Sequence, residues 1–296
     1  MQDVVIIGGS FAGLSAALQL GRARRKVTVL DTATPRNRFA DHAHGILGHD
    51  GKAPQDILAA ARAQFLPYRS VTFRNDGASL IEGEKDRFVV TLFSGDRIET
   101  RRIILSHGIT DIMPDIPGFA RAWGKTVLHC PYCHGFEVAD RRLGVLYFGP
   151  LSAHVTAMLQ DWTEDLTVFA DGHEVEPEFR AKLAHKNIKL VEPKVTGIIE
   201  AGGVLSAVQV ASGAEIGLDA LFVGPRQKPS TNLHAQLGLV MDEMPLGQII
   251  HVDEMYQTSV PGIYAAGDVA SPRQSVPLAM AAGNLAGVNC HHSLLD

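Results

Sequence analysis

The first 31 residues combine two short apolar segments, a glycine-rich turn and a terminal acid in an order that few folds accommodate. Residues 4–7 and 27–30 are nearly or wholly apolar, as expected of parallel strands that are buried on both faces. The turn at 8–13 and the amphipathic segment 14–25 lie between them, and Asp31 follows the second apolar run. Strand, turn, helix, strand and acid in this order predict a βαβ unit that binds a dinucleotide.

Each residue type in this unit has a reason in the chemistry of a dinucleotide. Gly8 and Gly13 let the backbone turn tightly and approach a pyrophosphate, whose charge is favoured at the N-terminus of the following helix. Ser10 stands where such turns commonly have a further glycine, and its small side chain is tolerated there. Asp31 is placed to accept hydrogen bonds from a ribose diol. We therefore expect Gly8, Ser10, Gly13 and Asp31 to bind a nucleotide cofactor.

A second segment, near the C-terminus, has a related pattern. Residues 258–268 read as a turn and a strand that ends on Gly267 and Asp268. Residues 276–290 are rich in Ala and Gly, which predicts a helix packed closely against a neighbour. Asp268 therefore stands at a strand end, as Asp31 does, and an ordinary turn residue is the alternative interpretation.

The segment 129–135, HCPYCHG, carries the most informative chemistry of the chain. Cys130 and Cys133 are spaced to close a small disulfide ring, and Cys290 is the only other cysteine. A neighbouring base lowers the pKa of such a thiol and so generates the reactive thiolate. His134 is suited to that role because the pKa of histidine lies near neutrality.

Three other chemistries use a similar spacing. The attachment of a c-type haem requires export, and the first expected strand begins too near Met1 to leave room for a signal peptide. A glutaredoxin carries the same four residues at the start of a helix, but the next expected strand begins near Leu143 and leaves little room for one. Zinc is rarely wrapped by four ligands as close in sequence as His129, Cys130, Cys133 and His134. Redox chemistry is favoured over these alternatives, and we expect no metal site.

The two nucleotide-binding segments, with the cysteine pair between them, resemble the thioredoxin-reductase-like flavoproteins over essentially the whole chain. This resemblance implies that FAD is the cofactor and that the protein is a homodimer. It further implies that Gly267 and Asp268 contact the ribityl and phosphate part of FAD. The backbone of Gln274, Ser275 and Val276 would then face the flavin ring.

The residues around the cysteines are similar to a subgroup of these flavoproteins. Thioredoxin reductases have an acid after the second cysteine, where this chain has His134. The run CPYCHGFE resembles the dithiol oxidases that close disulfides in gliotoxin- and holomycin-type metabolites, and their bacterial relatives. The resemblance implies that Cys133 faces the flavin and reacts with it, that Cys130 exchanges with the substrate, and that His134 is the acid/base.

Thioredoxin reductases carry a second dinucleotide fold, for NADPH, after their cysteines, and here its signature is degraded. Residues 143–170 keep the outline of strand, turn, helix and strand. Tyr147, Gly149 and Ser152 stand where the first unit has Gly8, Ser10 and Gly13. Asp171 and Glu174 follow the second strand, where a 2′-phosphate would need cations. The sequence argues against NADPH, with NADH binding through Asp171 as the alternative.

Composition limits the partners. The 296 residues carry a formal net charge of −5 without a long basic run, so we expect neither nucleic acid nor an anionic membrane as a partner. No apolar run reaches transmembrane length, and we expect a cytoplasmic protein. The partner is expected to be a small-molecule dithiol or disulfide, or a thioredoxin-like protein. His42, His44 and His49 could suggest a metal, but the resemblance implies that their loop runs beside the flavin, and we interpret them as loop or active-site residues. Cys290 is interpreted as a quiet buried or terminal thiol.

These observations predict an α/β protein with two Rossmann-like nucleotide-binding domains, each a three-layer ββα sandwich, the second inserted into the first. Residues 1–111 and 245–296 would form the FAD domain, residues 112–244 the domain of the redox pair, and 112–118 and 241–247 the linkers. We expect an FAD-dependent dithiol oxidase that passes electrons to oxygen or another acceptor. The alternatives are a thioredoxin reductase driven by NAD(P)H or another reductant, and a flavin-binding redox sensor without turnover.

Overall fold

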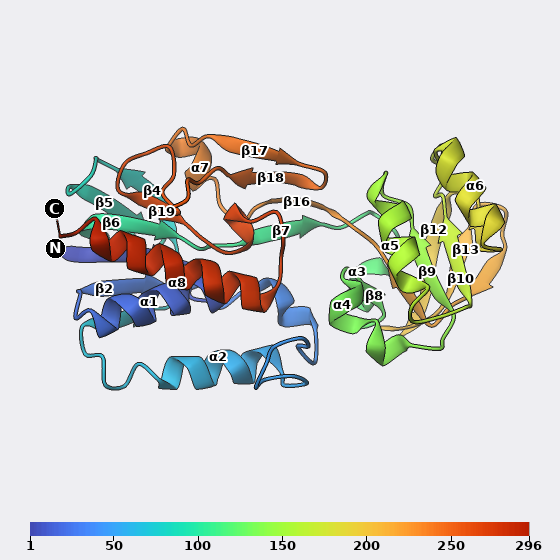
Figure 1. Ribbon diagram of the computed structural model, residues 1–296, viewed down its shortest axis with the longest axis horizontal. Helices are drawn as coiled ribbons and strands as arrows, with labels where there is room; N and C mark the ends of the chain where they lie inside the picture. The colour runs from blue at the N-terminus through green and yellow to red at the C-terminus, as the bar shows by residue number, and fades with distance from the viewer. Residues whose placement is uncertain (296) are drawn as a thin grey trace. The chain divides into compact units, whose positions relative to one another are not determined.

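The computed structural model describes residues 1–295, which fold into an α/β protein of two compact units (Figure 1). The first unit comprises Met1–Arg38, Pro54–Thr110 and residues 227–295, and the second comprises Phe39–Ala53 and Asp111–Arg226. The predicted fold class, with one unit inserted into the other, is confirmed.

The first unit is built on a seven-stranded sheet whose central strands are parallel. Parallel strands are buried on both faces, which explains the nearly or wholly apolar runs at residues 4–7 and 27–30. The hydrogen-bonded order is β3 (Val71–Arg74), β2 (Val27–Leu30), β1 (Gln2–Ile7), β6 (Arg97–Leu105), β5 (Phe88–Leu92) and β4 (Ala78–Glu82), with β19 (Ile263–Ala265) also paired to β6.

Two helices, α1 (Phe11–Arg22) and α8 (Val276–His292), lie side by side on one face of this sheet (Figure 1). They approach closely because α8 is rich in small residues: a Cβ on Gly283 would lie 2.0 Å from the carbonyl oxygen of Ala12. Helix α1 begins and ends three residues earlier than the expected span 14–25. It cannot continue to residue 25 because Arg24 takes a left-handed conformation with φ 60°.

The other face of the sheet is covered by residues of the C-terminal segment, which share a core with side chains of β4 and β5. Leu233 and Ile250 pack there with Leu105 of β6, so residues 227–244 belong to the first unit rather than to the insertion, whose end the sequence placed at 244. The expected linker 241–247 is instead part of a hairpin in a four-stranded sheet. The elements of this region are α7 (Leu233–Gln236), β17 (Met241–Met244), β18 (Gly247–Ile250), β16 (Arg226–Pro229), β7 (Ile109–Ile112) and η3 (Asp268–Ala270), and α2 (Pro54–Ala63) and η1 (Arg36–Phe39) complete the helices.

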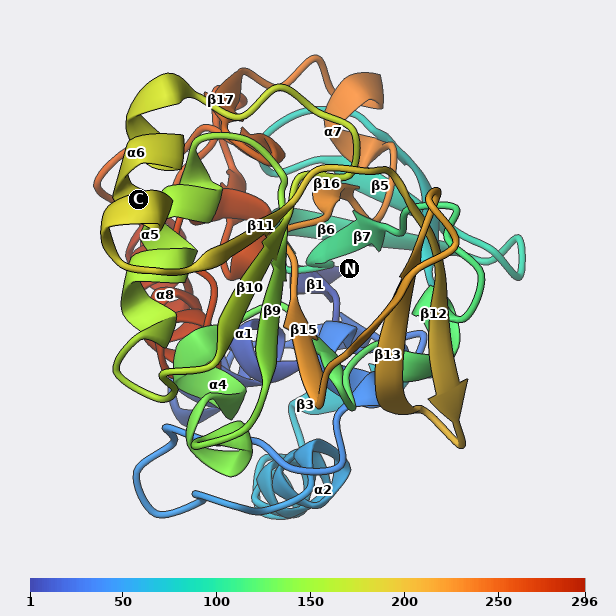
Figure 2. The ribbon, with the colours of Figure 1, turned by 90° about the vertical axis from the view of Figure 1, so that its right-hand side faces the viewer.

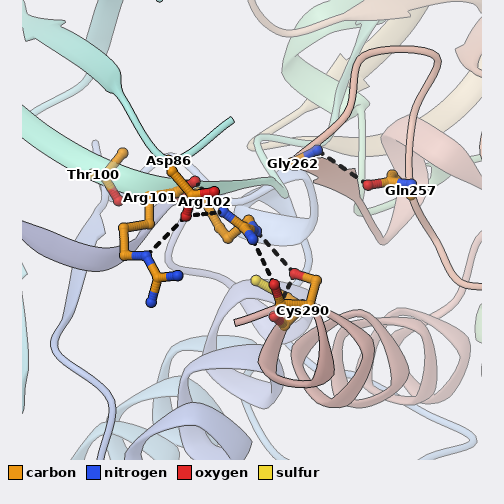
Figure 3. A network of polar contacts seen from close by, with 8 residues as sticks. Asp86, Thr100, Arg101, Arg102, Gln257, Gly262 and Cys290 are labelled. Carbon is orange, nitrogen blue, oxygen red and sulfur yellow. Dashed lines mark hydrogen bonds and ion pairs between the residues drawn. The ribbon is translucent and has the colours of Figure 1, made fainter. Parts of the chain in front are cut away.

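The C-terminal end of α8 is anchored to β6 by Arg102, a guanidinium that is only 1% exposed (Figure 3). Its Nε donates to Oγ of Ser293 over 2.9 Å, and Nη2 donates to the Ser293 carbonyl. Nη1 donates to Asp86 over 2.7 Å, which lowers the pKa of that carboxyl. Cys290 lies beside this network and is fully buried, and burial raises the pKa of its thiol to about 12. A thiol of this kind is unreactive, as expected for Cys290.

The second unit repeats the layered plan (Figure 2). Its parallel sheet has helices on one face and a small antiparallel sheet on the other, and each face has its own apolar core. The parallel sheet runs β11 (Lys189–Val191), β10 (Leu166–Phe169), β9 (Leu143–Leu146), β15 (Ala220–Phe222) and β8 (Val127–Leu128), and the antiparallel sheet runs β12 (Val195–Ala201), β13 (Val204–Val210) and β14 (Glu215–Gly217). The helices are α3 (Phe119–Ala122), α4 (Pro131–His134), η2 (Phe136–Val138), α5 (Leu151–Leu159) and α6 (Pro177–His185). Among residues 1–295, no helix combines the length and the apolar character needed to span a bilayer.

Candidate active site

The turn between β1 and α1 has the bare backbone that a pyrophosphate requires. Gly8 adopts φ 109°, and a Cβ at this position would lie 2.2 Å from the carbonyl oxygen of Ser106. A Cβ on Gly13 would lie 1.8 Å from the carbonyl oxygen of Gly8. Ser10 is the N-cap residue of α1, and its side chain makes no capping hydrogen bond. The turn therefore fits a diphosphate at the N-terminus of a twelve-residue helix.

Asp31 lies at the carboxyl end of β2, beside a cavity of about 270 Å³. One carboxylate oxygen accepts the backbone N–H of Ala33 over 3.0 Å, and the other forms an ion pair with Arg62. The guanidinium of Arg62 lies 5.5 Å from the ring centre of Phe73. A carboxylate beside a half-apolar cavity at a strand end suits the ribose and base of an adenosine. The cavity is lined by Asp31, Ala33, Arg62, Phe73, Arg74 and Asn75.

The late Gly-Asp segment lies next to this turn, as the sequence pattern suggested. A Cβ on Gly267 would lie 2.9 Å from Cβ of Ala12, in the first turn of α1. Asp268 accepts a hydrogen bond from Arg36 over 3.3 Å, and Arg36 also donates to Gln274 over 2.6 Å.

The polar network continues to the start of α8. The side-chain amide of Gln274 donates to Gln227 over 2.8 Å. Ser275 caps α8 by accepting the N–H of Leu278 over 3.4 Å, and Val276 is the first helical residue. The structure thus gathers the nucleotide-binding candidates of both chain ends at one edge of the sheet.

Sequence reasoning did not identify Arg36, Arg62 or Gln227 as members of this site. Arg62 is on α2 and Gln227 on β16, far from any recognised motif, so only the tertiary fold brings them to the site. Arg36 offered a weak signal, because it follows the Asp31 strand in a loop rich in turn residues.

The cysteine pair lies in the second unit, where β8 leads into the short helix α4. Cys130 is the N-cap residue of α4 and Cys133 lies one turn later, with Pro131 at the first helical position. The two cysteines are present as thiols, with their Sγ atoms 2.7 Å apart and both side chains half-buried. A small closing movement would bring the sulfurs to disulfide distance, which is about 2.05 Å. The spacing that predicted a redox pair thus places the sulfurs together.

His134 ends α4 directly after the second cysteine. Neither of its ring nitrogens is exposed to solvent or has a hydrogen-bond partner. Burial lowers the pKa of this imidazole, the Glu137 carboxylate opposes that effect, and the His44 ring adds to it. An imidazole whose ring nitrogens are buried and have no hydrogen-bond partner, directly after Cys133 in the chain, is suited to act as a base.

The three loop histidines do not form a metal centre with these cysteines. Residues 39–53 pack with the second unit, and Nε2 of His44 lies 3.4 Å from Oε1 of Glu137. His42 contacts the carbonyl of Gly51, and His49 contacts Lys52. Within residues 1–295, no set of three or more His, Cys, Asp and Glu side chains is arranged to hold a metal ion.

Around the turn after β9, where a second nucleotide would bind, three polar side chains form hydrogen bonds within the protein. Tyr147 donates its hydroxyl to Glu176 over 2.8 Å. The hydroxyl of Ser152, fully buried in α5, accepts the backbone N–H of Phe148 over 2.9 Å. Asp171 accepts the N–H of Val195 over 2.8 Å. One amide of the turn and the acid after β10 therefore already have partners within the protein.

Comparison with known proteins identifies a family and several relatives of this chain. Residues 2–284 match the family model described as pyridine nucleotide-disulphide oxidoreductase. The curated thioredoxin reductase sirT of Leptosphaeria maculans is 32% identical, over 96% of this chain and 92% of its own length. The crystal structure of an oxidoreductase from Agrobacterium tumefaciens is 41% identical with a TM-score of 0.94, covering 99% of this chain and 98% of that one. The crystal structure of HlmI is 36% identical with a TM-score of 0.93, covering 100% of this chain and 93% of that one.

Proposed function

The chain belongs to the pyridine nucleotide-disulphide oxidoreductase family, as a thioredoxin-reductase-like enzyme, and on that premise we propose that it is an FAD-dependent dithiol oxidase. Membership of this family implies a flavin cofactor. The finer assignment concerns which partner gives electrons to the cysteine pair. We propose a substrate dithiol as donor and oxygen or another acceptor as the final oxidant.

The observation that carries the proposal is the pair of thiols 2.7 Å apart, followed in the chain by His134, whose buried ring nitrogens have no hydrogen-bond partner. In the oxidising half-reaction, a substrate thiol gives its proton to His134, and its thiolate attacks Sγ of Cys130 in the Cys130–Cys133 disulfide. The S–S bond breaks, and its electron pair leaves on Cys133. The second substrate thiol then displaces Cys130, which closes the substrate disulfide and leaves the protein pair reduced by two electrons.

The first unit has the residues to hold FAD rather than FMN. The turn at Gly8 and Gly13 suits a pyrophosphate, and the cavity beside Asp31 suits an adenosine, neither of which FMN has. Asp268 and Gln274, held by Arg36, are the proposed partners of the ribityl and flavin end, with Ser275 and Val276. A bound flavin would supply the two-electron acceptor for the reduced cysteine pair.

The second unit supports a donor other than NADPH. In a functional turn, backbone amides bind the phosphates, whereas here Ser152 already accepts the N–H of Phe148. Glu176, which accepts from Tyr147, adds a carboxylate near the place where the anion would sit. Loss of one charge-assisted phosphate contact typically weakens binding by about 1.5–3 kcal/mol. The loss of several such contacts would raise the dissociation constant for NADPH above its cellular concentration.

Anaerobic stopped-flow spectroscopy of the flavin tests the proposal. A dithiol should bleach the oxidised flavin rapidly and saturably, and NADPH should do so slowly or not at all. The Cys130→Ser variant is the matched control, since it retains the cofactor site and loses the exchanging thiol. Rapid bleaching by micromolar NADPH would instead establish the reductase direction. A protein that dithiols reduce under nitrogen but that does not turn over once oxygen or another acceptor is added would be a sensor.

A further inference from the structure

The segment 39–53 interrupts the first unit and belongs to the second, where His44 contacts a residue that closely follows the redox motif. A bridge between Ala43 and Lys52 closes it, and the ring of His42 contacts the carbonyl of Gly51. Asp50 is fixed from within, because it accepts the N–H of Gly45 over 2.7 Å. These contacts join the two sides of the loop to each other.

His44 connects two carboxylates from this position. Its Nδ1 lies 3.7 Å from Oδ1 of Asp50, and its Nε2 lies 3.4 Å from Oε1 of Glu137. The His44 side chain is 19% exposed and Glu137 is 39% exposed, so the pair is partly shielded from solvent. Glu137 is in η2, three residues after His134. Through His44, the loop therefore contacts Glu137, which lies one short turn after the proposed base His134.

The proposed base has no other partner to stabilise its charged form. Both ring nitrogens of His134 are buried and without a hydrogen bond. The charged groups that act on it are the Glu137 carboxylate and His44, beside the two cysteine thiols of its own helix. A buried imidazole that accepts a proton becomes a buried cation, which is costly without a neighbouring anion.

We propose that Glu137 is the carboxylate that stabilises His134 after it has accepted the thiol proton, and that His44 is a positioning residue that holds Glu137 for this role. The inference rests on the assignment of His134 as base in the proposed function. When the substrate thiol gives its proton to His134, the positive charge forms on a ring whose pKa the Glu137 carboxylate raises. His44 fixes that carboxylate and is itself held by Asp50.

The alternative is that the His44–Glu137 contact is an ordinary surface ion pair without effect on the chemistry. A third reading is that His44 acts only through its own positive charge, which disfavours a second cation on His134. These readings differ in sign. Loss of a positioning residue weakens the effect of Glu137, whereas loss of a positive neighbour makes His134 easier to protonate.

The test is the pH dependence of the second-order rate constant for anaerobic flavin reduction by dithiothreitol. Its acid limb reports the protonation of the base in the unliganded enzyme. Glu137→Gln removes the group that raises the pKa of His134, so the limb should move to lower pH by about 0.5–1 unit. The limiting rate should fall several-fold because the base is weaker. Glu137→Asp keeps the charge and should recover most of the shift.

His44→Gln should move the limb in the same direction by a smaller amount, and the double variant should shift no further than Glu137→Gln alone. His49→Gln, in the same loop but in contact with Lys52, is the matched control and should leave the limb in place. An unchanged limb in Glu137→Gln would overturn the proposal. So would an upward shift in His44→Gln, or a full additional shift in the double variant.

Flavin absorbance and thermal melting establish that each variant is folded and loaded. Glu137→Asp provides a second measure of the carboxylate if Glu137→Gln folds poorly. Single-turnover reduction by dithiothreitol does not depend on the final acceptor. A missing shift therefore leaves the oxidase assignment standing, and a lack of oxygen-linked turnover leaves the role of Glu137 standing.

Discussion

At the scale of single residues, the proposed chemistry depends on two thiols at different positions of one short helix. Cys130 caps the short helix α4 and Cys133 lies inside its first turn. The proposed division of labour, with Cys130 exchanging with substrate and Cys133 passing electrons to the flavin, makes the two serine variants unequal.

Cys130→Ser is expected to leave Cys133 as a thiolate next to oxidised flavin, which gives a broad charge-transfer band at long wavelength. Cys133→Ser should lack that band, and both variants should lose dithiol turnover. Absorbance spectra at pH 8 decide this, with Cys290→Ser as the control because its thiol is fully buried. Undiminished dithiol oxidation by Cys130→Ser would rule out the exchange mechanism.

His134→Ala is expected to keep its flavin and to slow flavin reduction by dithiols about 10²- to 10⁴-fold, since the attacking thiol loses its base. Burial lowers the pKa of His134 from its ordinary value of 6.5, and a general base is active above its pKa. The wild-type rate should therefore stay high as the pH falls to 6.5 and decline only at lower pH. Stopped-flow rates between pH 5 and pH 8 measure this limb, which should be absent from the variant.

Residue identity alone predicted the members of the site that belong to compact motifs. Gly8, Gly13 and Asp31 follow from the βαβ pattern, and Cys130, Cys133 and His134 all lie within the short segment 130–134. Arg62 and the His44–Glu137 contact could not be predicted in this way. Each joins segments whose proximity depends on the packing of other elements, and neither arginine–aspartate nor histidine–glutamate pairs have a spacing rule across such distances.

At the scale of elements, the helices explain why small residues are concentrated where they are. The first turn of α1 tolerates no side chain at Gly13, because a Cβ would lie 1.8 Å from the Gly8 carbonyl oxygen. The sequence predicted this helix but placed its start at residue 14. It did not reveal that the glycine already lies within the helix, since the amphipathic pattern becomes visible only after it.

Gly13→Ala is therefore expected to purify with little or no flavin, because α1 must move away from the turn that holds the pyrophosphate. Gly95→Ala provides the control: Gly95 also has a positive φ, at 89°, but a Cβ there meets nothing within 4 Å. The ratio of flavin to protein absorbance compares the two. Equal flavin content in both variants would mean that this turn does not carry the cofactor.

Arg102→Met is expected to destabilise the fold by about 2–4 kcal/mol at pH 7, because the C-terminal end of α8 loses the hydrogen bonds to Ser293. The same guanidinium lowers the pKa of Asp86 below 3.8. Stability from that contact is present above pH 3.8 and is lost as the pH falls through the folded-state pKa. The gap between wild type and variant in denaturant unfolding should thus narrow below about pH 4, with the exposed Arg87→Met as control.

At the scale of the whole molecule, the sequence predicted two layered units and their nesting but not their borders. Helix and strand periodicity identifies elements, and the parallel sheets followed from uninterrupted apolar runs. Borders depend instead on which surface an element covers. For that reason the structure assigns two segments to a different unit than the sequence predicted. Residues 227–244 belong to the first unit, where Leu233 joins the core of the sheet. Residues 39–53 belong to the second unit, where His44 contacts Glu137.

The cofactor-binding candidates lie in the first unit, so added FAD should stabilise that unit selectively. Calorimetry of the flavin-depleted protein is expected to show two transitions, one of which rises with FAD. The gain should be about 2.7 kcal/mol at a free concentration one hundred times Kd. Adenosine monophosphate at equal concentration is the control, since it lacks the flavin end. A uniform shift of both transitions would show that FAD is not confined to the first unit.

The division of the chain has a consequence for modular exchange. The second unit is encoded in two separate pieces, Phe39–Ala53 and Asp111–Arg226. A chimaera that imports only the longer piece from a relative would combine a foreign Glu137 equivalent with the native His44 segment. Recombination at a single pair of crossover points therefore transfers the redox motif with its supporting loop only if it also transfers Pro54–Thr110 of the first unit. Engineers who wish to graft substrate preference between members of this family should move both pieces together.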